Sequence, residues 1–439
     1  MAPIPPIMAI LFAVAIPCFA GCFTCCFVRC APCRKPKATG TAENAATKEE
    51  KGDDSAEDPG CTQTTRWEVC APITLVLSVL ASFFTIAIVG AIFAAAGGLE
   101  WLLYYPITDS ACSTSCAYEV RNGLNWAVDE NCCSYTDSGP LTIARQDVWL
   151  QYPSTATGAA TNVIHGFLMV NATRGAPRGR LSVLYCHGSG NNVAAGYRSE
   201  RYAHYLSLGN VAMFVFDYPG YGKSPGQPST YSVQGTVEAS EAAAQWFASW
   251  DAAYNPVTGY APLPASTLSA PIVLPTRDLS AVDLSNVTVL GRSLGWSMAT
   301  WVSSNARVTP NGLILQSAFS SVTDLAKYYM PMYWWTVAGT AKSSFAEYDT
   351  RANVARYAAA TAAARRCVFH SHSKSDEWVP FWHAERLRTA LTDAGMTVSS
   401  SDGTGCFVAL TLANAIHTQP LVIPEEERAT LLWLSGRRI

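Results

Sequence analysis

The hydrophobic pattern divides the chain into two long apolar stretches near its start and a longer region of short alternating elements. The stretches span residues 7–28 and 71–98, and neither contains a charged side chain. A helix of about 20 apolar residues can cross a bilayer, whereas a core helix of this length would carry a polar stripe. We therefore predict a transmembrane helix over residues 71–98.

The first apolar stretch fits several structures. Pro17 interrupts it and no basic residue precedes it, so residues 1–30 could form a second span, a cleaved signal peptide or a lipidated surface segment. Cysteines beside basic residues are candidates for palmitoylation, and the alternative is that they serve as small apolar residues in lipid. The candidates are Cys25, Cys26, Cys30 and Cys33.

A polar linker over residues 31–70 separates the two stretches, and its Lys, Glu, Asp and Ala content predicts disorder. Basic residues flank this linker, but only Arg121 and Arg145 follow the second stretch before residue 150. The positive-inside bias therefore places the linker in the cytoplasm and the rest of the chain on the lumenal or extracellular side. The opposite topology, with the C-terminal region on the cytoplasmic face, stays open.

The connecting segment 99–146 and the residues after it carry further signs of an oxidising compartment. Asn171 begins a glycosylation sequon, and the second sequon, at Asn286, abuts a buried strand and carries less weight. Cysteines clustered in a short polar stretch are typical of disulfides. The four are Cys112, Cys116, Cys132 and Cys133.

Residues 147–439 alternate between short apolar runs and helical patterns. The apolar runs predict strands within residues 147–152, 162–171, 179–192, 210–229, 287–290, 311–321, 365–380 and 405–420. The helical patterns lie at 198–209, 232–250, from Ser293 to about 302, and at 424–438. Strands that alternate with helices predict an α/β fold with a mostly parallel, doubly wound sheet, whose chemistry lies at the carboxyl ends of the strands.

The segment "VTVLGRSLGWSMAT", residues 287–300, reads as strand, sharp turn and helix. Gly291 and Gly295 would let the two backbones pass closely, with Ser293 at the apex of a strained turn. A serine nucleophile needs a base, usually a histidine that a carboxylate orients. Asp376 and His417 follow later strands in the order Ser, Asp, His, which predicts a catalytic triad.

The remaining polar groups at the strand ends have expected roles of their own. An oxyanion would accept hydrogen bonds from the backbone N–H groups of Ser189 and Leu294. His187, before Gly188, should shape its loop, and Glu377 is a rival for the acid. We assign His165, His204, His370 and His383 to polar surface.

Five segments in order resemble the α/β-hydrolase superfamily. They are "YCHGSGNN", "VFDYPGYGKSPGQPS", "VLGRSLG", "LILQSAFSSVTDLA" and "HSKSDEWVP". The chain most resembles membrane-associated α/β-hydrolase-domain proteins, which include depalmitoylases and lysophospholipases. The resemblance implies Ser293 as nucleophile, Asp376 as acid, His417 as base and Asp217 as a structural residue. Departures are Trp296 beside the elbow, where it would narrow the site or reshape helix packing, and a long insertion over residues 251–286.

The amino-acid composition limits the classes of molecule that the chain is expected to bind. With 30 basic and 33 acidic residues the chain has a formal net charge of −3, so we expect no nucleic acid partner. We also expect no metal and no cofactor. A lipid ester or a lipidated protein is the expected substrate, because a membrane anchor and the apolar run 328–335 suit an acyl chain, although ordinary core packing is the alternative for that run. A serine peptidase, or a catalytically silent binding module of the same fold, is the alternative.

Overall fold

The chain divides into two compact units, Met1–Ala96 and Gly97–Ile439. The computed structural model describes residues 76, 79–80, 82, 121–122, 128–129, 132–133, 142–156, 160–171, 180–189, 192–206, 208, 211–226, 233–254, 270–329, 350–361, 367–399, 407–417 and 424–436. In the first unit, Val76, Val79, Leu80 and Ser82 are helical. Within the described residues, no helix combines the length and apolarity that a membrane crossing requires. The expected segments 1–30 and 31–70, and most of 71–98, lie outside the described residues.

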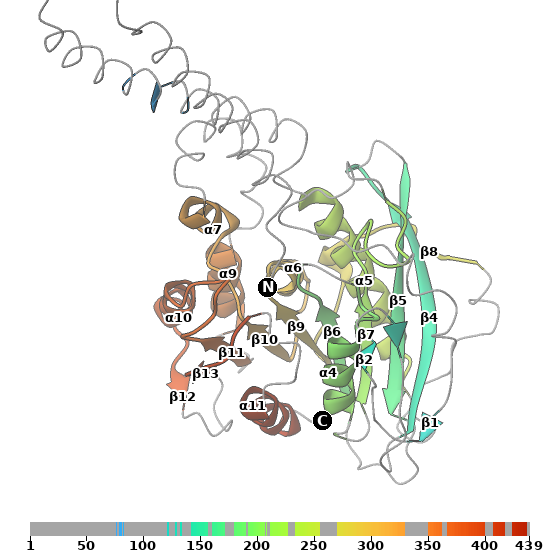
Figure 1. Cartoon of the computed structure of the whole chain (residues 1–439). Helices are drawn as coiled ribbons and strands as arrows, with labels where there is room; N and C mark the ends of the chain where they lie inside the picture. The colour runs from blue at the N-terminus through green and yellow to red at the C-terminus, as the bar shows by residue number, and fades with distance from the viewer. Residues whose placement is uncertain are drawn as a thin grey trace, which may run out of the picture. The chain divides into compact units, whose positions relative to one another are not determined.

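The second unit is built on a twisted sheet, seen nearly edge-on in Figure 1. Its strands are β1 (Arg121–Asn122), β4 (Thr142–Pro153), β5 (Thr161–Asn171), β6 (Leu181–Cys186), β7 (Val211–Phe216), β8 (Ile272–Val273), β9 (Val287–Arg292), β10 (Gly312–Gln316), β11 (Cys367–Ser373), β12 (Val398–Ser399) and β13 (Phe407–Leu412). A separate ribbon pairs β2 (Val128–Asp129) with β3 (Cys132–Cys133). The first long strand thus begins at Thr142, five residues before the predicted domain start.

The strand order among the described residues is β1-β4-β5-β7-β6-β9-β10-β11-β13-β12, with β8 paired to β4. The pairs β4–β5 and β5–β7 are antiparallel, and every pair from β7 through β12 is parallel. The predicted α/β fold with a mostly parallel sheet is therefore confirmed. Because neighbouring strands run the same way, the loops that follow β6, β9, β11 and β13 emerge at one edge.

Helices cover both faces of this sheet (Figure 1). They are α4 (Gly196–Leu206), α5 (Val233–Ala252), η4 (Leu279–Ala281), α6 (Gly295–Asn305), α7 (Val322–Tyr329), α9 (Thr350–Thr361), α10 (Trp382–Asp393) and α11 (Pro424–Ser435). Side chains alternate along each strand, so the core falls into two clusters. One joins the sheet to α5, α6, α9 and α10, and the other joins it to α4 and α11.

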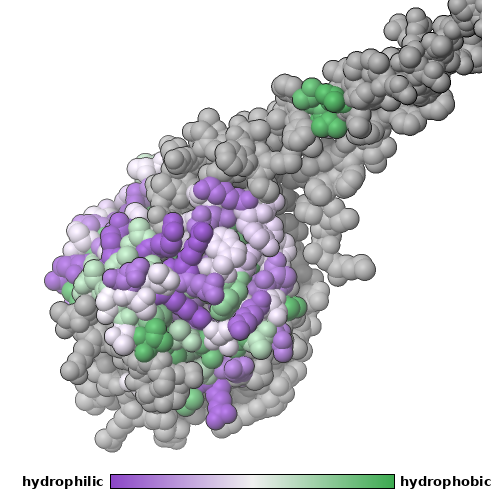
Figure 2. Space-filling view, turned by 90° about the vertical axis from the view of Figure 1, so that its left-hand side faces the viewer, coloured by the Kyte–Doolittle hydropathy of each residue, from purple (hydrophilic) through white to green (hydrophobic). Residues whose placement is uncertain are grey.

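The central strands are buried on both faces, as expected for a parallel sheet between two helical layers. Every residue of β6, β7, β9 and β10 is buried. The surface that carries α7, α10 and β12 is mainly hydrophilic, with smaller hydrophobic patches (Figure 2). The buried centre of the sheet therefore holds the strand ends that carry the predicted chemistry.

Candidate active site

The turn between β9 and α6 holds Ser293 in a left-handed backbone conformation, with φ of 50°. Its N–H donates to the carbonyl of Gln316 at 2.9 Å. A Cβ on Gly291 would lie 2.2 Å from Trp296 Cα, and one on Gly295 would lie 2.0 Å from the Cys186 carbonyl oxygen. Both glycines are required because strand and helix backbones are already in contact, which keeps the serine at the apex.

Trp296 turns away from the site. Its side chain is fully buried in the core beneath α6, and its ring packs edge-to-face against Phe319 with centroids 6.3 Å apart. The large ring therefore fills the space between helix and sheet. Of the two effects expected for it, reshaping of the helix packing is the one that this position supports.

Ser293, His417 and Asp376 meet at the carboxyl edge of the sheet, although 124 and 41 residues separate the histidine from the serine and the aspartate. His417 Nε2 lies 2.9 Å from Ser293 Oγ, and Nδ1 lies 2.8 Å from Asp376 Oδ2. An ionised carboxylate only accepts hydrogen bonds, so the ring proton belongs on Nδ1. The lone pair of Nε2 then faces the serine hydroxyl and can take its proton.

The Asp376 carboxyl is buried but well supplied with donors. Its Oδ1 accepts hydrogen bonds from the backbone N–H groups of Trp378 at 3.0 Å and Val379 at 2.7 Å. Burial alone would raise its pKa, but the hydrogen bond from His417 and the nearby histidines outweigh burial, so the pKa lies below its ordinary value. The group is therefore ionised at neutral pH and can stabilise an imidazolium.

The loop after β6 brings backbone donors to the serine. A Cβ on Gly188 would lie 3.0 Å from Ser293 Cβ, so this loop touches the nucleophile turn. Within the described part of the chain, neither the Ser189 N–H nor the Leu294 N–H has a hydrogen-bond partner. Ser189 is exposed and Leu294 is the residue before α6. The two N–H groups are thus available to an oxyanion.

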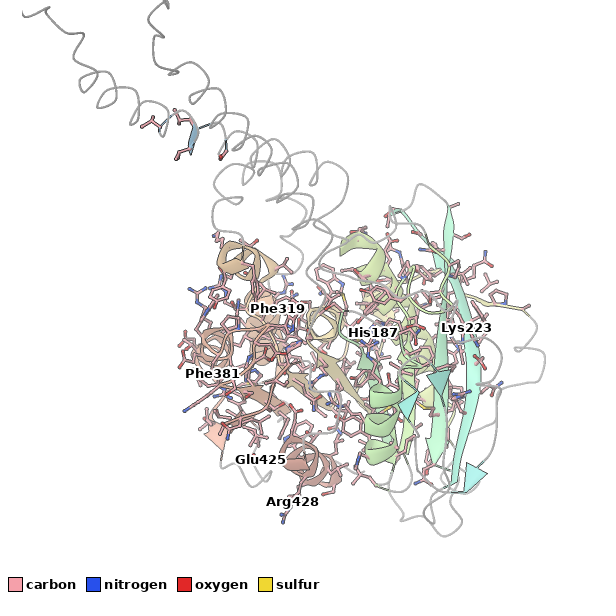
Figure 3. All side chains as sticks on the ribbon, in the orientation of Figure 1. His187, Lys223, Phe319, Phe381, Glu425 and Arg428 are labelled. Carbon is pink, nitrogen blue, oxygen red and sulfur yellow. The ribbon has the colours of Figure 1, made fainter. Side chains whose placement is uncertain are left out.

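Buried groups hold this loop in shape. Figure 3 shows His187 in the interior of the domain, where its Nδ1 lies 2.7 Å from the Gly188 carbonyl and its ring packs on Tyr218. Burial, together with the charge of Arg198, lowers the pKa of His187 well below its ordinary range, so the ring is neutral. Asp217 Oδ1 accepts a hydrogen bond from Val193 N–H at 2.8 Å, which fastens the loop to the turn after β7.

Arg198, which the sequence did not single out, holds the same loop through its side chain. Its guanidinium is buried and donates to the carbonyls of Gly188 at 2.9 Å and Asn192 at 2.8 Å. Its position two residues after the start of a surface helix gave no sign of this role. The arginine fixes both ends of the loop that supplies the Ser189 N–H.

The assignment of four histidines to polar surface is wrong for three of them. His165, His370 and His383 are buried, and only His204 is exposed. His165 Nε2 lies 2.6 Å from Asp147 Oδ1. Burial lowers the pKa of His165, but the hydrogen bond to Asp147 and the negative charges of Asp147 and Asp217 outweigh burial, so the pKa is raised. His165 and His370 lie in strands β5 and β11, and His383 lies in the first turn of α10, where one polar side chain among apolar ones is buried with its neighbours.

His383 belongs to a second cluster of serine, histidine and aspartate. Its Nδ1 accepts from the Ser320 N–H at 3.0 Å and lies 2.8 Å from Ser320 Oγ. Ser320 Oγ also lies 3.1 Å from Asp324 Oδ2. Burial lowers the pKa of His383 to about 3, although the Asp324 carboxylate opposes this. The cluster links β10, α7 and α10.

The other predicted sites have mixed outcomes. Asn171 is buried and its Nδ2 donates to the Leu206 carbonyl at 2.6 Å, which argues against a glycan on that nitrogen. Cys132 and Cys133 form β3, whose backbone pairs with β2. The predicted sites outside the described residues are Cys25, Cys26, Cys30, Cys33, Cys112 and Cys116.

Two further cysteines have defined states. Cys367, the first residue of β11, is disulfide-bonded. Cys186, the last residue of β6, is a free, buried thiol. Within the described ranges, no group of three or more His, Cys, Asp or Glu side chains is arranged to hold a metal ion.

Comparison with known proteins gives three kinds of similarity. Residues 276–405 match the prolyl oligopeptidase family model, a range that includes Ser293 and Asp376 but ends before His417. The chain is 25% identical over 214 residues to the α/β-hydrolase domain-containing protein WAV2 of Arabidopsis thaliana, covering 47% of this chain. It spans 55%, about half, of the length of that curated relative.

Solved structures with similar folds are esterases and a related hydrolase. Carboxyl esterase 2 of Tuber melanosporum has a TM-score of 0.43 at 13% identity, over 74% of this chain and 91% of that one. An esterase of Pyrococcus furiosus has a TM-score of 0.41 at 12% identity, over 72% of this chain and 96% of that one. A puromycin hydrolase has a TM-score of 0.42 at 13% identity, over 66% of this chain and 38% of that one.

Proposed function

Because the chain belongs to the α/β-hydrolase superfamily, we propose that it is a membrane-anchored serine hydrolase that cleaves an ester or thioester of a lipid acyl group. The observation that carries the proposal is the hydrogen-bonded line from Asp376 through His417 to Ser293. An imidazole aimed at a serine in a strained turn, beside two open backbone N–H donors, is the arrangement that acyl transfer requires.

The chemistry follows from this geometry. Ser293 Oγ attacks the substrate carbonyl carbon while its proton passes to His417 Nε2, and Asp376 stabilises the resulting imidazolium. The carbonyl oxygen becomes an anion that accepts hydrogen bonds from the Ser189 and Leu294 N–H groups. The leaving group departs with the proton from Nε2, and the same histidine then activates water to release the acid from the acyl-enzyme.

Exposed aromatic side chains beside the acid loop support an apolar substrate. Tyr328, Tyr329 and Trp378 are each about half exposed, and the Tyr329 hydroxyl donates to the carbonyls of Glu377 and Trp378. Aromatic rings with one polar end suit a boundary between water and an acyl chain. Together with the uncharged stretch 71–98, they favour a lipid ester as substrate.

The disulfide at Cys367 bears on the compartment. Structural disulfides persist in oxidising compartments and are rare in the cytosol. This supports a catalytic domain on the lumenal or extracellular side, where a lipid ester is a more accessible substrate than the palmitoyl thioester of a cytoplasmic protein. Mass spectrometry of the non-reduced native protein tests the placement, and a free Cys367 thiol would contradict it.

A serine peptidase is the second candidate, and the match of residues 276–405 to the prolyl oligopeptidase family favours it. The same serine, histidine and oxyanion donors cleave amides and esters. The two functions differ in the substrate pocket and not in the triad.

A fluorophosphonate probe tests the proposal. We expect the full-length protein to be labelled, and Ser293→Ala to abolish labelling while the variant keeps its thermal unfolding midpoint. Turnover is then compared on lysophosphatidylcholine, an S-palmitoyl peptide, and a peptide with proline before the scissile bond. An unlabelled, folded protein contradicts the enzyme proposal, and cleavage of the peptide alone would replace the lipid substrate with a peptide.

A further inference from the structure

The His417 loop is held through its backbone as well as through its ring. The His417 N–H donates to Glu377 Oε2 at 2.6 Å, and the His417 carbonyl accepts from Arg292 Nη2 at 3.5 Å. Asp376 and Glu377 are adjacent, so one two-residue segment bonds both the ring and the main chain of the histidine. Glu377, the rival acid in the sequence, therefore bonds the main chain of the triad histidine, whereas Asp376 bonds its ring.

Arg292 connects the other side of the same peptide to the nucleophile strand. It is the last residue of β9, directly before Ser293, and its side chain is only 10% exposed. Its Nη1 donates to Glu426 Oε2 at 3.3 Å. A guanidinium presents several donors in a rigid fork, so one side chain can bond the histidine carbonyl and a carboxylate together.

Glu426 closes the network from the C-terminal helix. Its side chain is 1% exposed, in the first turn of α11, and its Oε1 accepts from Ser371 Oγ at 2.5 Å. A buried carboxylate is costly unless it is paired and hydrogen-bonded, and here both conditions are met. Glu425, the preceding residue, is exposed on the same helix and is labelled there in Figure 3.

These contacts join four parts of the chain at one point: the nucleophile strand, β11, the acid loop and α11. We propose that Arg292, Glu377 and Glu426 are positioning residues that set the main chain of His417, so that its Nε2 stays on Ser293 Oγ. The proposal rests on the proposed function, since it assigns how that triad is held. None of the three touches the reacting atoms.

Substitutions at these three residues test the positioning role in the full chain, with Glu425→Gln as the matched control. We expect Glu426→Gln and Arg292→Lys to lower kcat/KM toward p-nitrophenyl butyrate by about 10- to 100-fold, mostly through kcat, because small misplacements of a base are costly. Glu377→Gln keeps one acceptor oxygen, so its kcat/KM should fall less than that of Glu377→Leu. Glu425→Gln should match the wild type.

Arg292→Met leaves the Glu426 carboxylate buried and unpaired, so it could also lower stability. The double variant Arg292→Met/Glu426→Leu removes both charges, and its loss of activity should not exceed that of Arg292→Met alone if the two act through one ion pair. Thermal unfolding midpoints are measured for every variant. Losses that track unfolding alone, with kcat/KM of the folded fraction intact, overturn the proposal.

A second measurement does not depend on turnover. The Nδ1 proton shared by His417 and Asp376 should give a low-field proton resonance that His417→Gln removes. We expect Glu426→Gln and Arg292→Lys to broaden or shift this resonance, and Glu425→Gln to leave it unchanged. An unaltered resonance in the first two overturns the positioning proposal, whereas absence of fluorophosphonate labelling in the wild type contradicts only the proposed function.

Discussion

The domain holds two clusters of serine, histidine and aspartate, and the use of the ring nitrogens separates them. In the Ser293 cluster (Ser293, His417 and Asp376) the aspartate bonds Nδ1 and the serine faces Nε2. In the Ser320 cluster (Ser320, His383 and Asp324) the serine backbone and hydroxyl both lie against Nδ1, and the aspartate contacts the serine instead.

The environments differ as much as the contacts. Ser320 is fully buried, and the Nε2 of His383 has no hydrogen-bond partner among the described residues. No carboxylate of the described segments hydrogen-bonds this ring from its far side, and burial keeps the ring neutral with a pKa of about 3. The Ser293 cluster lies beside two open N–H groups. Proximity of the three residue types is therefore not enough, because chemistry needs a base with a free lone pair, an oriented ring and access.

The largest expected difference comes from the two serines. Ser293→Ala should abolish fluorophosphonate labelling and lower kcat by about 10⁶-fold, as removal of a triad nucleophile does elsewhere. Ser320→Ala should keep labelling within a few-fold of the wild type, because its hydroxyl serves packing. If labelling survived in Ser293→Ala and disappeared in Ser320→Ala, Ser320 and not Ser293 would be the nucleophile.

The two aspartates give the next largest effect. Asp376→Asn should lower kcat by about 10⁴-fold, since an amide no longer holds His417 in the required tautomer. Asp324→Asn, which loses charge beside Arg386 but not a bond to the ring, should change kcat by less than about threefold and lower the unfolding midpoint slightly. Steady-state kinetics on an activated ester compares them, and equal losses would contradict the distinction.

Each cluster has an arginine beside it, Arg198 near Ser293 and Arg386 near Ser320, and substitution of the two should have different effects. Arg198→Met should lower kcat by about 100-fold, because the loop that supplies an oxyanion donor loses two clamps. Arg386 stacks on Trp382 and bonds Asp324 beside the Ser320 cluster. Arg386→Met should leave kcat unchanged, and the ratio of the two kcat values is the measurement. If both variants changed kcat by a similar factor, the proposed role of the Arg198-held loop in catalysis would be contradicted.

The smallest effect is on acid stability. The pKa of His383 is about 3 in the folded state, against about 6.5 for an unfolded chain. The folded protein therefore binds this proton more weakly, so the stability from neutral His383 is present above pH ~6.5 and is lost as the pH falls toward 3. His383→Gln should flatten the fall in unfolding free energy across this window, while the exposed control His204→Gln should not. Denaturant unfolding at several pH values measures the slopes, and identical slopes would contradict the assignment.

Sequence order alone located the strand ends that meet at the site. The pattern around Ser293 is weak by itself, because short Gly/Ser patterns occur by chance, but the apolar run before it and the helical run after it predict a strand packed on a helix. Asp376 and His417 could be placed since each follows a buried strand of one parallel sheet. The mostly parallel sheet could be predicted because strand patterns alternate with helix patterns along residues 147–439.

The parts that escaped prediction depend on packing between distant segments. Arg198 lies in an ordinary helix, and only tertiary structure turns its guanidinium onto Gly188. Glu377 looked like a rival acid because sequence cannot tell a bond to a ring from a bond to its backbone. The buried histidines were missed for a similar reason, since a polar side chain in a strand or a helix gives no sign of the residues that pack against it.

The wide spacing of the triad along the chain has a practical consequence. Ser293 comes from β9, Asp376 follows β11 and His417 follows β13, so reactivity exists only after the last strand has docked. A full-length but incompletely folded molecule would contain all three side chains and still not react with the fluorophosphonate probe. Covalent labelling of this one serine can thus count the correctly assembled molecules in a preparation, independently of how much polypeptide is present.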